Sequence, residues 1–442
     1  MDAVMLSRLQ FAFTIGFHFI FPPTTFALTL IILIVESAYL RKGEERFRDV
    51  SAFLTRILGL VFVLGTATGV VMEFSFGSNW SRYARVVGDV FGAPLVAEVI
   101  LAFFLESVFL GVLVFGRNRV SRRAYWWAAF LVFFGAHLSG FWIIAANSWM
   151  QTPAGFRMAH GGVAVLTDFP AAIFNPSTLI RFGHTILAGW ITGSLVVTAI
   201  ACWYMLKGVF AEQARILFRV ALSIFIAASL LQLGSGHIHS LQVARTQPEK
   251  MAAFEALWKT QKGAPLSIFA LPDEKNGSNR FFLGIPRMLS FLIHFNFDAQ
   301  IQGLDAFPRD QRPPVTIPFA AYHAMFAIGL WFIALSLAAL LQMARGKIGN
   351  SRLLLKTLLF SSPLGYIACE TGWIAAEVGR QPWVVYRVLK TSQSVSPAVP
   401  VGQIAATLFL FLIIYGMLFS VFLKVFLKFV RTGPVPTRTA GY

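Results

Sequence analysis

The chain has 442 residues, of which 57% are hydrophobic, 15% aromatic and 13% charged. Soluble domains are about 45–50% apolar and about 25% charged, so this composition excludes an ordinary water-soluble enzyme. It also excludes a disordered chain, because disorder requires low hydrophobicity. The net charge of +17 would suggest nucleic-acid binding in a soluble protein. Here the basic residues cluster in short loops between apolar runs, which indicates membrane topology and no nucleic-acid partner.

Nine apolar runs are long enough to cross about 30 Å of hydrocarbon as helices. We expect these spans at residues 13–39, 53–75, 93–115, 124–147, 182–206, 216–236, 317–343, 353–377 and 400–426. Pro22 and Pro23 predict a kink in the first. The predicted fold is an all-α, polytopic membrane helix bundle. Residues 1–236 hold six spans, residues 237–316 form an extracytoplasmic loop, and residues 317–442 hold three spans.

The distribution of basic residues predicts the orientation. The loops on one side hold nineteen Lys and Arg residues, whereas the short loops on the other side hold seven. The positive-inside rule therefore places the N-terminus outside and the C-terminus inside. The two cysteines, Cys202 and Cys369, lie within apolar runs, so neither a disulfide framework nor a cysteine zinc site is expected. Because the positive charge follows the long first run, no cleavable signal peptide is expected.

Ionisable residues inside spans are functional candidates, because their burial is costly unless they are paired. The set comprises His18, Glu73, Glu98, Glu106, His137, His184, His323, Glu370 and Glu377. An alternative holds for each of them alone: a histidine near a helix end is often structural, and a glutamate there often reaches the interface.

Four candidates lie at similar depth near the outer ends of four spans: His18, His184, Met325 and Glu377. Histidine and methionine are axial ligands of haem iron in electron-transfer proteins. Aromatic and small residues surround them, as a flat macrocycle in a helix bundle requires. The alternative for Met325 is ordinary core packing.

Glu98 and Glu106 share the third span and lie eight residues apart, which is about 12 Å along a helix. Two carboxylates on one broad face in hydrocarbon indicate a proton relay, unless each bonds a backbone or hydroxyl partner. In the eighth span, Glu370, Trp373 and Glu377 recur on one face, and Arg380 follows. This stripe suits a redox or proton site in which Arg380 offsets negative charge, such as a haem propionate.

The long loop contains a short amphipathic pattern of Met251, Phe254, Glu255 and Trp258. It predicts a short helix that lies on the mouth of the bundle beside the lipid interface. Lys250 and Glu255 are suited to bind and deprotonate a quinol there. The alternative is an ordinary solvated helix.

Several motifs in order make the chain resemble subunit I of the cytochrome bd-type quinol oxidases over nearly its whole length. They are LSRLQF at 6–11, ATG at 67–69, MEF at 72–74, FGSNW at 76–80, VGDVFGAPL at 87–95, AFFLES at 102–107, ANSWMQ at 146–151, WYMLKG at 203–208 and GRQPW at 379–383.

The resemblance implies three haems: a low-spin haem b, a high-spin haem b, and a haem d or a further haem b in its place. His184 and Met325 would hold the low-spin haem, and His18 and Glu377 would each ligate one high-spin haem. The resemblance also implies roles for the remaining candidates. Glu98 and Glu106 would lie on the proton route, Lys250 and Glu255 would bind quinol, and Trp373 and Arg380 would lie beside the haem pair.

The resemblance also implies a second large membrane subunit, subunit II, and in many members a small single-span subunit. The expected location is the bacterial cytoplasmic (inner) membrane, as a multi-pass protein in the lipid bilayer. The expected reaction oxidises quinol outside and reduces O2 to water with protons taken from the cytoplasm. It generates membrane potential without pumping.

The chain departs from the family at one position beside a ligand. Family members carry an arginine two residues before the axial methionine, where this chain has His323. His323 is therefore a rival axial ligand to Met325, and a bis-histidine haem would have a lower potential. The loop is also of the short form. Two other functions stay open from the residues alone: an electron-conducting cytochrome b without oxygen chemistry, and a proton-coupled transporter, although no internal repeat is visible.

Overall fold

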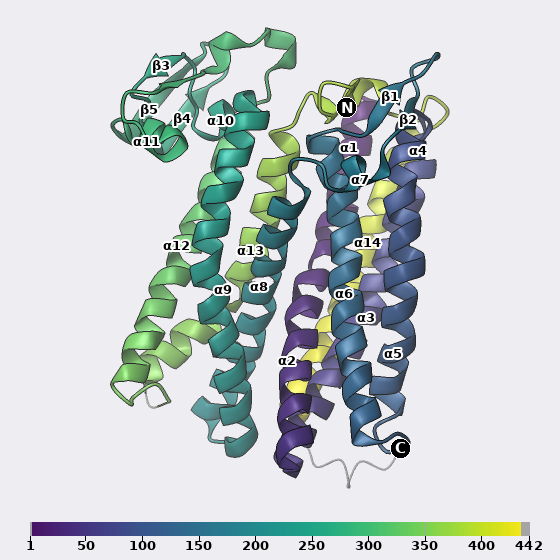
Figure 1. The fold of residues 1–442 in the computed structure, drawn as a ribbon, viewed down its shortest axis with the longest axis vertical. Coiled ribbons are helices and arrows are strands. Elements are labelled where there is room, and N and C mark those ends of the chain that lie inside the picture. The colour runs from purple at the N-terminus through teal and green to yellow at the C-terminus, as the bar shows by residue number, and fades with distance from the viewer. Residues whose placement is uncertain (1, 350, 435–442) are drawn as a thin grey trace.

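The computed structural model describes residues 2–349 and 351–434, which form an elongated bundle of roughly parallel helices (Figure 1). The long helices are α1 Ala3–Phe19, α2 Phe21–Lys42, α3 Glu45–Gly77, α4 Ser81–Ala97, α5 Phe104–Phe115, α6 Arg122–Gln151, α8 Thr178–Lys207, α9 Ala211–Thr246, α12 Thr316–Ala344, α13 Arg352–Val378 and α14 Val401–Thr432. A π-helical segment, Glu98–Phe103, joins α4 to α5.

The predicted helix bundle is confirmed. By length and composition, eight segments of the described residues are able to cross a membrane, and they match eight of the nine predicted spans. The ninth predicted span corresponds to α13, which is not among those eight. Its charged side chains, Lys356, Glu370 and Glu377, lower its hydropathy, yet it packs within the bundle against α8 and α12.

The first span is broken as Pro22 and Pro23 predict. α1 ends at Phe19 and α2 begins at Phe21, so both prolines lie in the first turn of the second helix. A proline costs little there because the first N–H groups of a helix have no partner in the helix. The break lets α1 and α2 follow different directions through the bundle.

The centre of the bundle is the tight contact between α2 and α8. A Cβ atom at Gly193 of α8 would lie 2.6 Å from the Cβ of Ala27 on α2, and one at Gly189 would lie 2.7 Å from Phe26. Small residues let the two backbones approach this closely, which is the usual way that helices pack in membranes. The two helices therefore form a fixed frame for the residues on the other face of α8.

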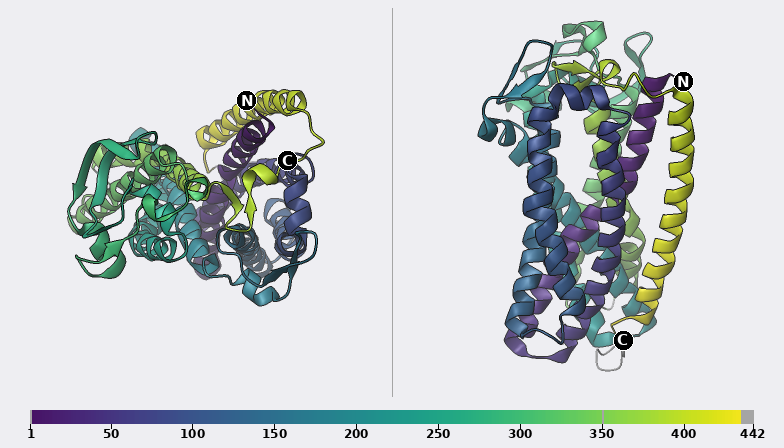
Figure 2. Two further views of the ribbon diagram at one scale, coloured as in Figure 1. Left: turned by 90° about the horizontal axis from the view of Figure 1, so that it is seen from above. Right: turned by 90° about the vertical axis from the view of Figure 1, so that its right-hand side faces the viewer.

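Short elements cover the end of the bundle at which α1 begins (Figures 1 and 2). They comprise helices α7 Phe169–Ile173, α10 Pro248–Phe254 and α11 Met288–His294, and 3-10 turns at Leu304–Ala306, Arg309–Gln311 and Thr391–Gln393. Antiparallel strand pairs join β1 Phe156–Met158 with β2 Ala164–Leu166, β3 Gln261–Lys262 with β6 Gln300–Ile301, β4 Leu266–Asp273 with β5 Ser278–Ile285, and β7 Trp383–Val385 with β8 Leu389–Lys390.

The long loop differs from its prediction in two ways. The sixth span was expected to end at residue 236, but α9 continues to Thr246, so less of the loop is free of the bundle. The predicted amphipathic helix is α10, and the side chains of residues 249–254 are all buried, in a helix that contacts α9 and α12. Both expectations for this segment, a solvated helix and a surface helix at the lipid interface, are therefore wrong.

Candidate functional site

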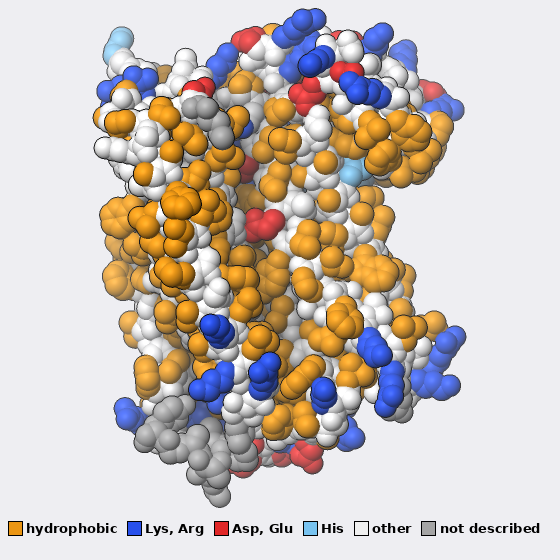
Figure 3. Space-filling model, turned by 180° about the vertical axis from the view of Figure 1, so that it is seen from behind, with side chains coloured by type: hydrophobic (Ala, Val, Ile, Leu, Met, Phe, Trp, Pro, Cys, Tyr) orange, Lys and Arg blue, Asp and Glu red, His pale blue; other side chains and the backbone are white. Residues whose placement is uncertain are grey.

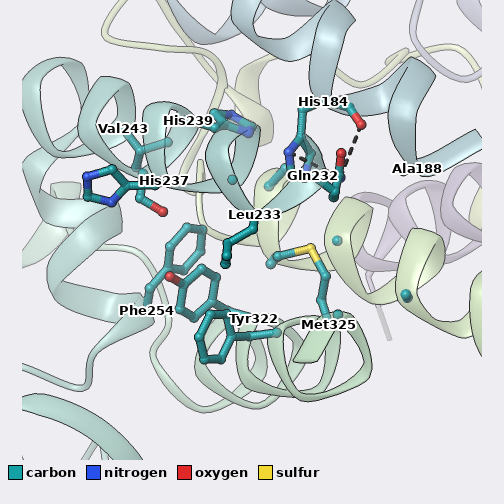
Figure 4. Close-up of a pocket in the computed structure, with 18 of the residues that line it drawn as sticks. His184, Ala188, Gln232, Leu233, His237, His239, Val243, Phe254, Tyr322 and Met325 are labelled. Atoms are coloured by element: carbon teal, nitrogen blue, oxygen red, sulfur yellow. Dashed lines mark hydrogen bonds between the residues drawn. The ribbon is translucent and has the colours of Figure 1, made fainter. Parts of the chain in front are cut away.

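A cavity of about 670 Å³ lies between α8, α9, α12 and α13, with α10 and the loop above it (Figure 4). Its size falls in the range of natural ligand sites, and its wall is mainly apolar. Six predicted residues share this wall: His184, Lys250, Glu255, His323, Met325 and Trp373. Side chains from four separate parts of the sequence thus meet in one space.

His184 and Met325 lie on different walls of the cavity, one on α8 and one on α12 (Figure 4). The Nδ1 atom of His184 lies 3.3 Å from Ser235 Oγ. Gln232 Nε2 donates to the His184 carbonyl oxygen at 3.2 Å. Met325 lies close to α13, where a Cβ at Gly372 would be only 2.8 Å from its sulfur. Gly372 therefore makes room for the thioether.

His323 lines the same cavity, but both of its ring nitrogens face backbone carbonyl groups. Nδ1 lies 2.9 Å from the oxygen of Phe319, and Nε2 lies 3.0 Å from the oxygen of Ser267. The ring also stacks on Phe319, with centroids 4.0 Å apart. Through these two contacts His323 joins strand β4 to α12.

Glu377 and Arg380 lie beside the cavity, at the end of α13, and form an ion pair. The other oxygen of Glu377 accepts from Asn147 Nδ2 and Gln151 Nε2, each at 3.2 Å. Lys250 Nζ in turn donates to Gln151 Oε1 at 2.5 Å. One hydrogen-bonded chain thus links α13, α6 and α10.

Positive charge exceeds negative charge in this region. Arg181, Lys250 and Arg380 are 5%, 2% and 5% exposed, and two buried carboxylates lie near them: Glu377, and Glu249, which also pairs with Arg387. Arg380 Nε and Nη1 and Arg181 Nε are buried without a hydrogen-bond acceptor among the described residues. Burial lowers the pKa of Lys250 far below its ordinary value, and the two guanidinium groups lower it further. The arrangement is suited to receive an anionic group.

Glu255 lies in the loop just beyond α10 and is also buried. Its Oε2 accepts from the backbone N–H of Ser267 at 2.9 Å, and Ser267 Oγ donates to the Glu255 carbonyl oxygen at 2.6 Å. Burial raises the pKa of Glu255 to about 7, although the hydrogen bonds from Ser267 oppose the shift. Its carboxyl group can therefore gain or lose a proton near neutral pH.

His18 is not part of the cavity wall. It points from α1 to α3, where Nδ1 lies 3.0 Å from Thr68 Oγ1. A Cβ at Gly69 would lie 3.1 Å from the ring, so the glycine permits this approach. Among residues 2–349 and 351–434, no hydrogen bond or ion pair joins His18 to Glu377. Trp373, on the same helix as Glu377, contacts Phe19, the neighbour of His18, edge to face with centroids 5.3 Å apart.

Glu98 and Glu106 lie on the same span but not on one regular helix. Glu98 opens the π-helical segment, so the rotation expected from an uninterrupted α-helix does not hold between the two. Glu98 accepts a hydrogen bond from Ser139 Oγ of α6 at 2.6 Å, which is the hydroxyl partner that the alternative interpretation required. Glu106 is buried, and a Cβ at Gly135 of α6 would lie only 3.2 Å from the Cβ of Glu106, so the glycine permits this close packing. π segments are rare and occur often at functional sites.

Several residues of these networks were missed from sequence. Arg181 was counted as a loop residue, and Gln232 and His239 were not considered as partners of His184. The His239 ring lies edge to face with His184 at 5.2 Å. At the other end of the bundle, Glu36 was missed although it is buried in an ion pair of 2.7 Å with Arg117. A charged residue inside the first span was the available signal for Glu36.

The sequence matches the family model described as "Cytochrome bd terminal oxidase subunit I" over residues 6–434. The chain belongs to this family.

Relatives in two organisms match over nearly their whole length. Cytochrome bd-II ubiquinol oxidase subunit 1 of Escherichia coli (strain K12) is 34% identical, over 98% of this chain and 97% of the relative. Cytochrome bd ubiquinol oxidase subunit 1 of Bacillus subtilis (strain 168) is also 34% identical, over 98% and 94%. The solved structure of bd oxidase from Geobacillus thermodenitrificans matches with a TM-score of 0.91 at 28% identity, over 98% of this chain and 99% of that one. The predicted family and fold class are thereby confirmed.

The elevated pKa of Glu255 makes stability depend on pH. Its folded pKa is about 7, above its ordinary value, so folding favours the protonated form. The resulting contribution to the free energy of unfolding is complete when the pH is below the ordinary pKa. It is lost as the pH rises through 7, and the total loss is about 3 kcal/mol. As the pH rises from 5 to 8, the melting temperature of the wild type should therefore fall relative to that of Glu255→Gln.

The matched control is Asp273→Asn in the same loop. A hydrogen bond from Arg280 holds the pKa of Asp273 below its ordinary value, so this residue stays ionised over that range. The difference in melting temperature between the wild type and Asp273→Asn should not change with pH over this range. An equally flat profile for Glu255→Gln would contradict the assignment of the raised pKa.

Proposed function

We propose that this chain is the haem-bearing subunit of a terminal oxidase in the bacterial inner membrane that oxidises quinol and reduces O2 to water. Two quinols release four electrons and four protons, and one O2 takes up four electrons and four protons to form two waters. The observation that carries the proposal is the single cavity that His184, Met325, Lys250 and Glu255 share. It brings the donors expected for an electron-accepting haem together with the groups expected for quinol.

The residues present fit the haems that the family implies. An imidazole and a thioether on different walls of an apolar cavity match a low-spin haem b held by His184 and Met325. The unpaired N–H groups of Arg181 and Arg380 match the carboxylates of propionate side chains. His18 and Glu377 are proposed as ligands of the two high-spin haems, one a haem b and the other a haem d or a further haem b. When bound, haem would supply one-electron transfer and oxygen binding.

Lys250 and Glu255 are proposed to bind the quinol. The buried ammonium group of Lys250 donates a hydrogen bond to one quinol oxygen in addition to Gln151. Glu255, with a pKa of about 7, accepts a proton from a quinol hydroxyl at neutral pH. Both lie at the end of the bundle that carries the long loop, which makes residues 237–316 the quinol-binding loop. On the predicted orientation, the proton is released outside.

Glu98 and Glu106 are proposed to carry protons in the opposite sense, from the cytoplasm to the oxygen site. Ser139 holds the half-buried Glu98, and Glu106 is buried where it packs against α6. Proton uptake from one side and release on the other moves charge across the membrane, which is worth about 2.3 kcal/mol per charge at 100 mV. Trp373 and Arg380 line and neutralise the space near Glu377.

The proposed partners are subunit II, the second large membrane subunit, and a small single-span subunit. The exposed apolar faces of the bundle offer area for them. α14, for example, exposes Phe409, Leu410 and Met417 by 51–66%. Quinol and O2 are the proposed substrates, and the lipid bilayer is the surrounding medium.

The ligand assignment is tested on His184. His184→Ala should remove the low-spin haem bands from the reduced spectrum and retain the high-spin bands, because only one haem loses its imidazole. The control is His137→Phe, a membrane histidine that bonds the Phe133 carbonyl oxygen and Trp190 outside the cavity. This variant should keep all bands. Unchanged low-spin bands in His184→Ala would reject the assignment.

The same spectrum decides between the rival donors on α12. Met325→Leu should lower the midpoint potential of the low-spin haem or abolish its bands, whereas His323→Leu should keep a Met-ligated spectrum. The reverse pattern would assign the ligand to His323.

The proton route is tested with Glu106→Gln in vesicles that contain the two-subunit complex. Oxygen consumption should fall roughly hundredfold with all haems retained, because a glutamine cannot carry the proton. The exposed Glu212→Gln serves as the control and should keep full activity. Full activity of Glu106→Gln, or proton uptake by the wild type from the outer face, would contradict the proposed route.

A further inference from the structure

A cluster of exposed apolar side chains covers the hairpin formed by β4 and β5 and the segment after α11. Their exposed fractions run from 40% to 68%. The cluster comprises Ile268, Phe269, Leu271, Phe281, Phe282, Leu283, Ile285, Phe295 and Phe297. Isolated apolar residues are common on protein surfaces, but a contiguous group of this size marks an interaction surface.

The hairpin covers part of the bundle end and also extends sideways beyond it. Figures 1 and 2 show β4, β5 and α11 beyond the outer side of α12 and α9. In Figure 3, which shows the molecule from behind, hydrophobic side chains cover the lower part of this overhang, and Lys, Arg, Asp and Glu side chains lie above it. The apolar side thus faces the space beside the spans, where lipid must lie.

The overhang continues the lipid-facing surface of the bundle. β4 contacts α12, and α11 contacts α9. Below these contacts α12 exposes Ile317, Trp331 and Leu341, which are not part of the cavity wall, by 43–54%. An apolar surface therefore runs from the hairpin down onto a helix that crosses the membrane.

We infer that the β4–β5 hairpin and the segment after α11, residues 266–297, rest on the outer leaflet and bury this apolar cluster among phospholipids. An amphipathic element of this kind binds at the boundary between headgroups and acyl chains. The hairpin has only two strands, so its outer backbone groups have no strand partner. Because unpaired backbone groups are excluded from the hydrocarbon core, the hairpin lies at headgroup depth and no deeper.

The same elements roof the cavity. Leu266 and Ser267 of β4 and Leu289 and Ile293 of α11 form part of its wall. If the proposed function holds, a lipid-soluble quinol moves from the leaflet under the hairpin into the cavity without crossing water. The contact with lipid itself depends only on the surface described above and is tested without haem or substrate.

The test replaces Phe281 by p-benzoylphenylalanine, a photo-reactive residue of similar shape, in the intact oxidase complex. The complex is placed in vesicles of phosphatidylethanolamine and phosphatidylglycerol, irradiated, and analysed by mass spectrometry. The control carries the same residue at Arg309, an exposed charged position of the same loop. We expect roughly tenfold more phospholipid adduct at position 281 than at position 309, since an interfacial element contacts acyl chains directly.

Position 283 provides a second site in case the first variant fails to assemble, because Leu283 is equally exposed on β5. Adducts with phospholipid at either site support the inference. Adducts with a protein subunit instead would show that a partner covers the hairpin, and adduct levels equal to those at position 309 would show that it lies in water. Either of these results overturns the inference, whether or not the chain oxidises quinol.

Discussion

Charge buried at the edge of the hydrocarbon is the constraint on which the site depends. Arg181, Lys250 and Arg380 are removed from water, and the nearby buried carboxylates are Glu377 and Glu249, of which Glu249 also pairs with Arg387. Burying an uncompensated charge costs several kcal/mol, so such a cluster persists only where further negative groups bind or where its hydrogen bonds are saturated. Here several guanidinium N–H groups stay without an acceptor among the described residues. The fold therefore maintains a positive field that favours anionic groups beside the cavity.

Helix packing sets the positions of the groups that respond to this field. The close contact of α2 with α8 fixes the helix that carries Arg181 and His184, and Gly372 allows α13 to lie against Met325. The loop then closes the cavity from above, because Ser267 holds Glu255 on one side and His323 on the other. A change in the position of β4 would thus act on the proposed proton acceptor, Glu255, and on the helix that carries Met325 together.

The spans could be predicted from sequence, since hydropathy and the rarity of charge in hydrocarbon are local signals. Local patterns also gave the break at Pro22. The partners could not be predicted, because pairs such as Glu36 with Arg117 join segments that are remote in the sequence. The π-helical segment at Glu98 leaves no periodic signal, and the burial of α10 depends on the tertiary contact with α9 and α12.

We propose above all that this chain binds haem between His184 and Met325, beside the buried cations Arg181, Lys250 and Arg380. The most direct measurement is the absorption spectrum of the purified complex with subunit II, reduced and oxidised, together with chemical identification of the extracted haems. We expect three haems for each copy of this chain, one of them low-spin. A complex with its full subunit complement that is colourless, or that lacks the low-spin bands, would contradict the claim.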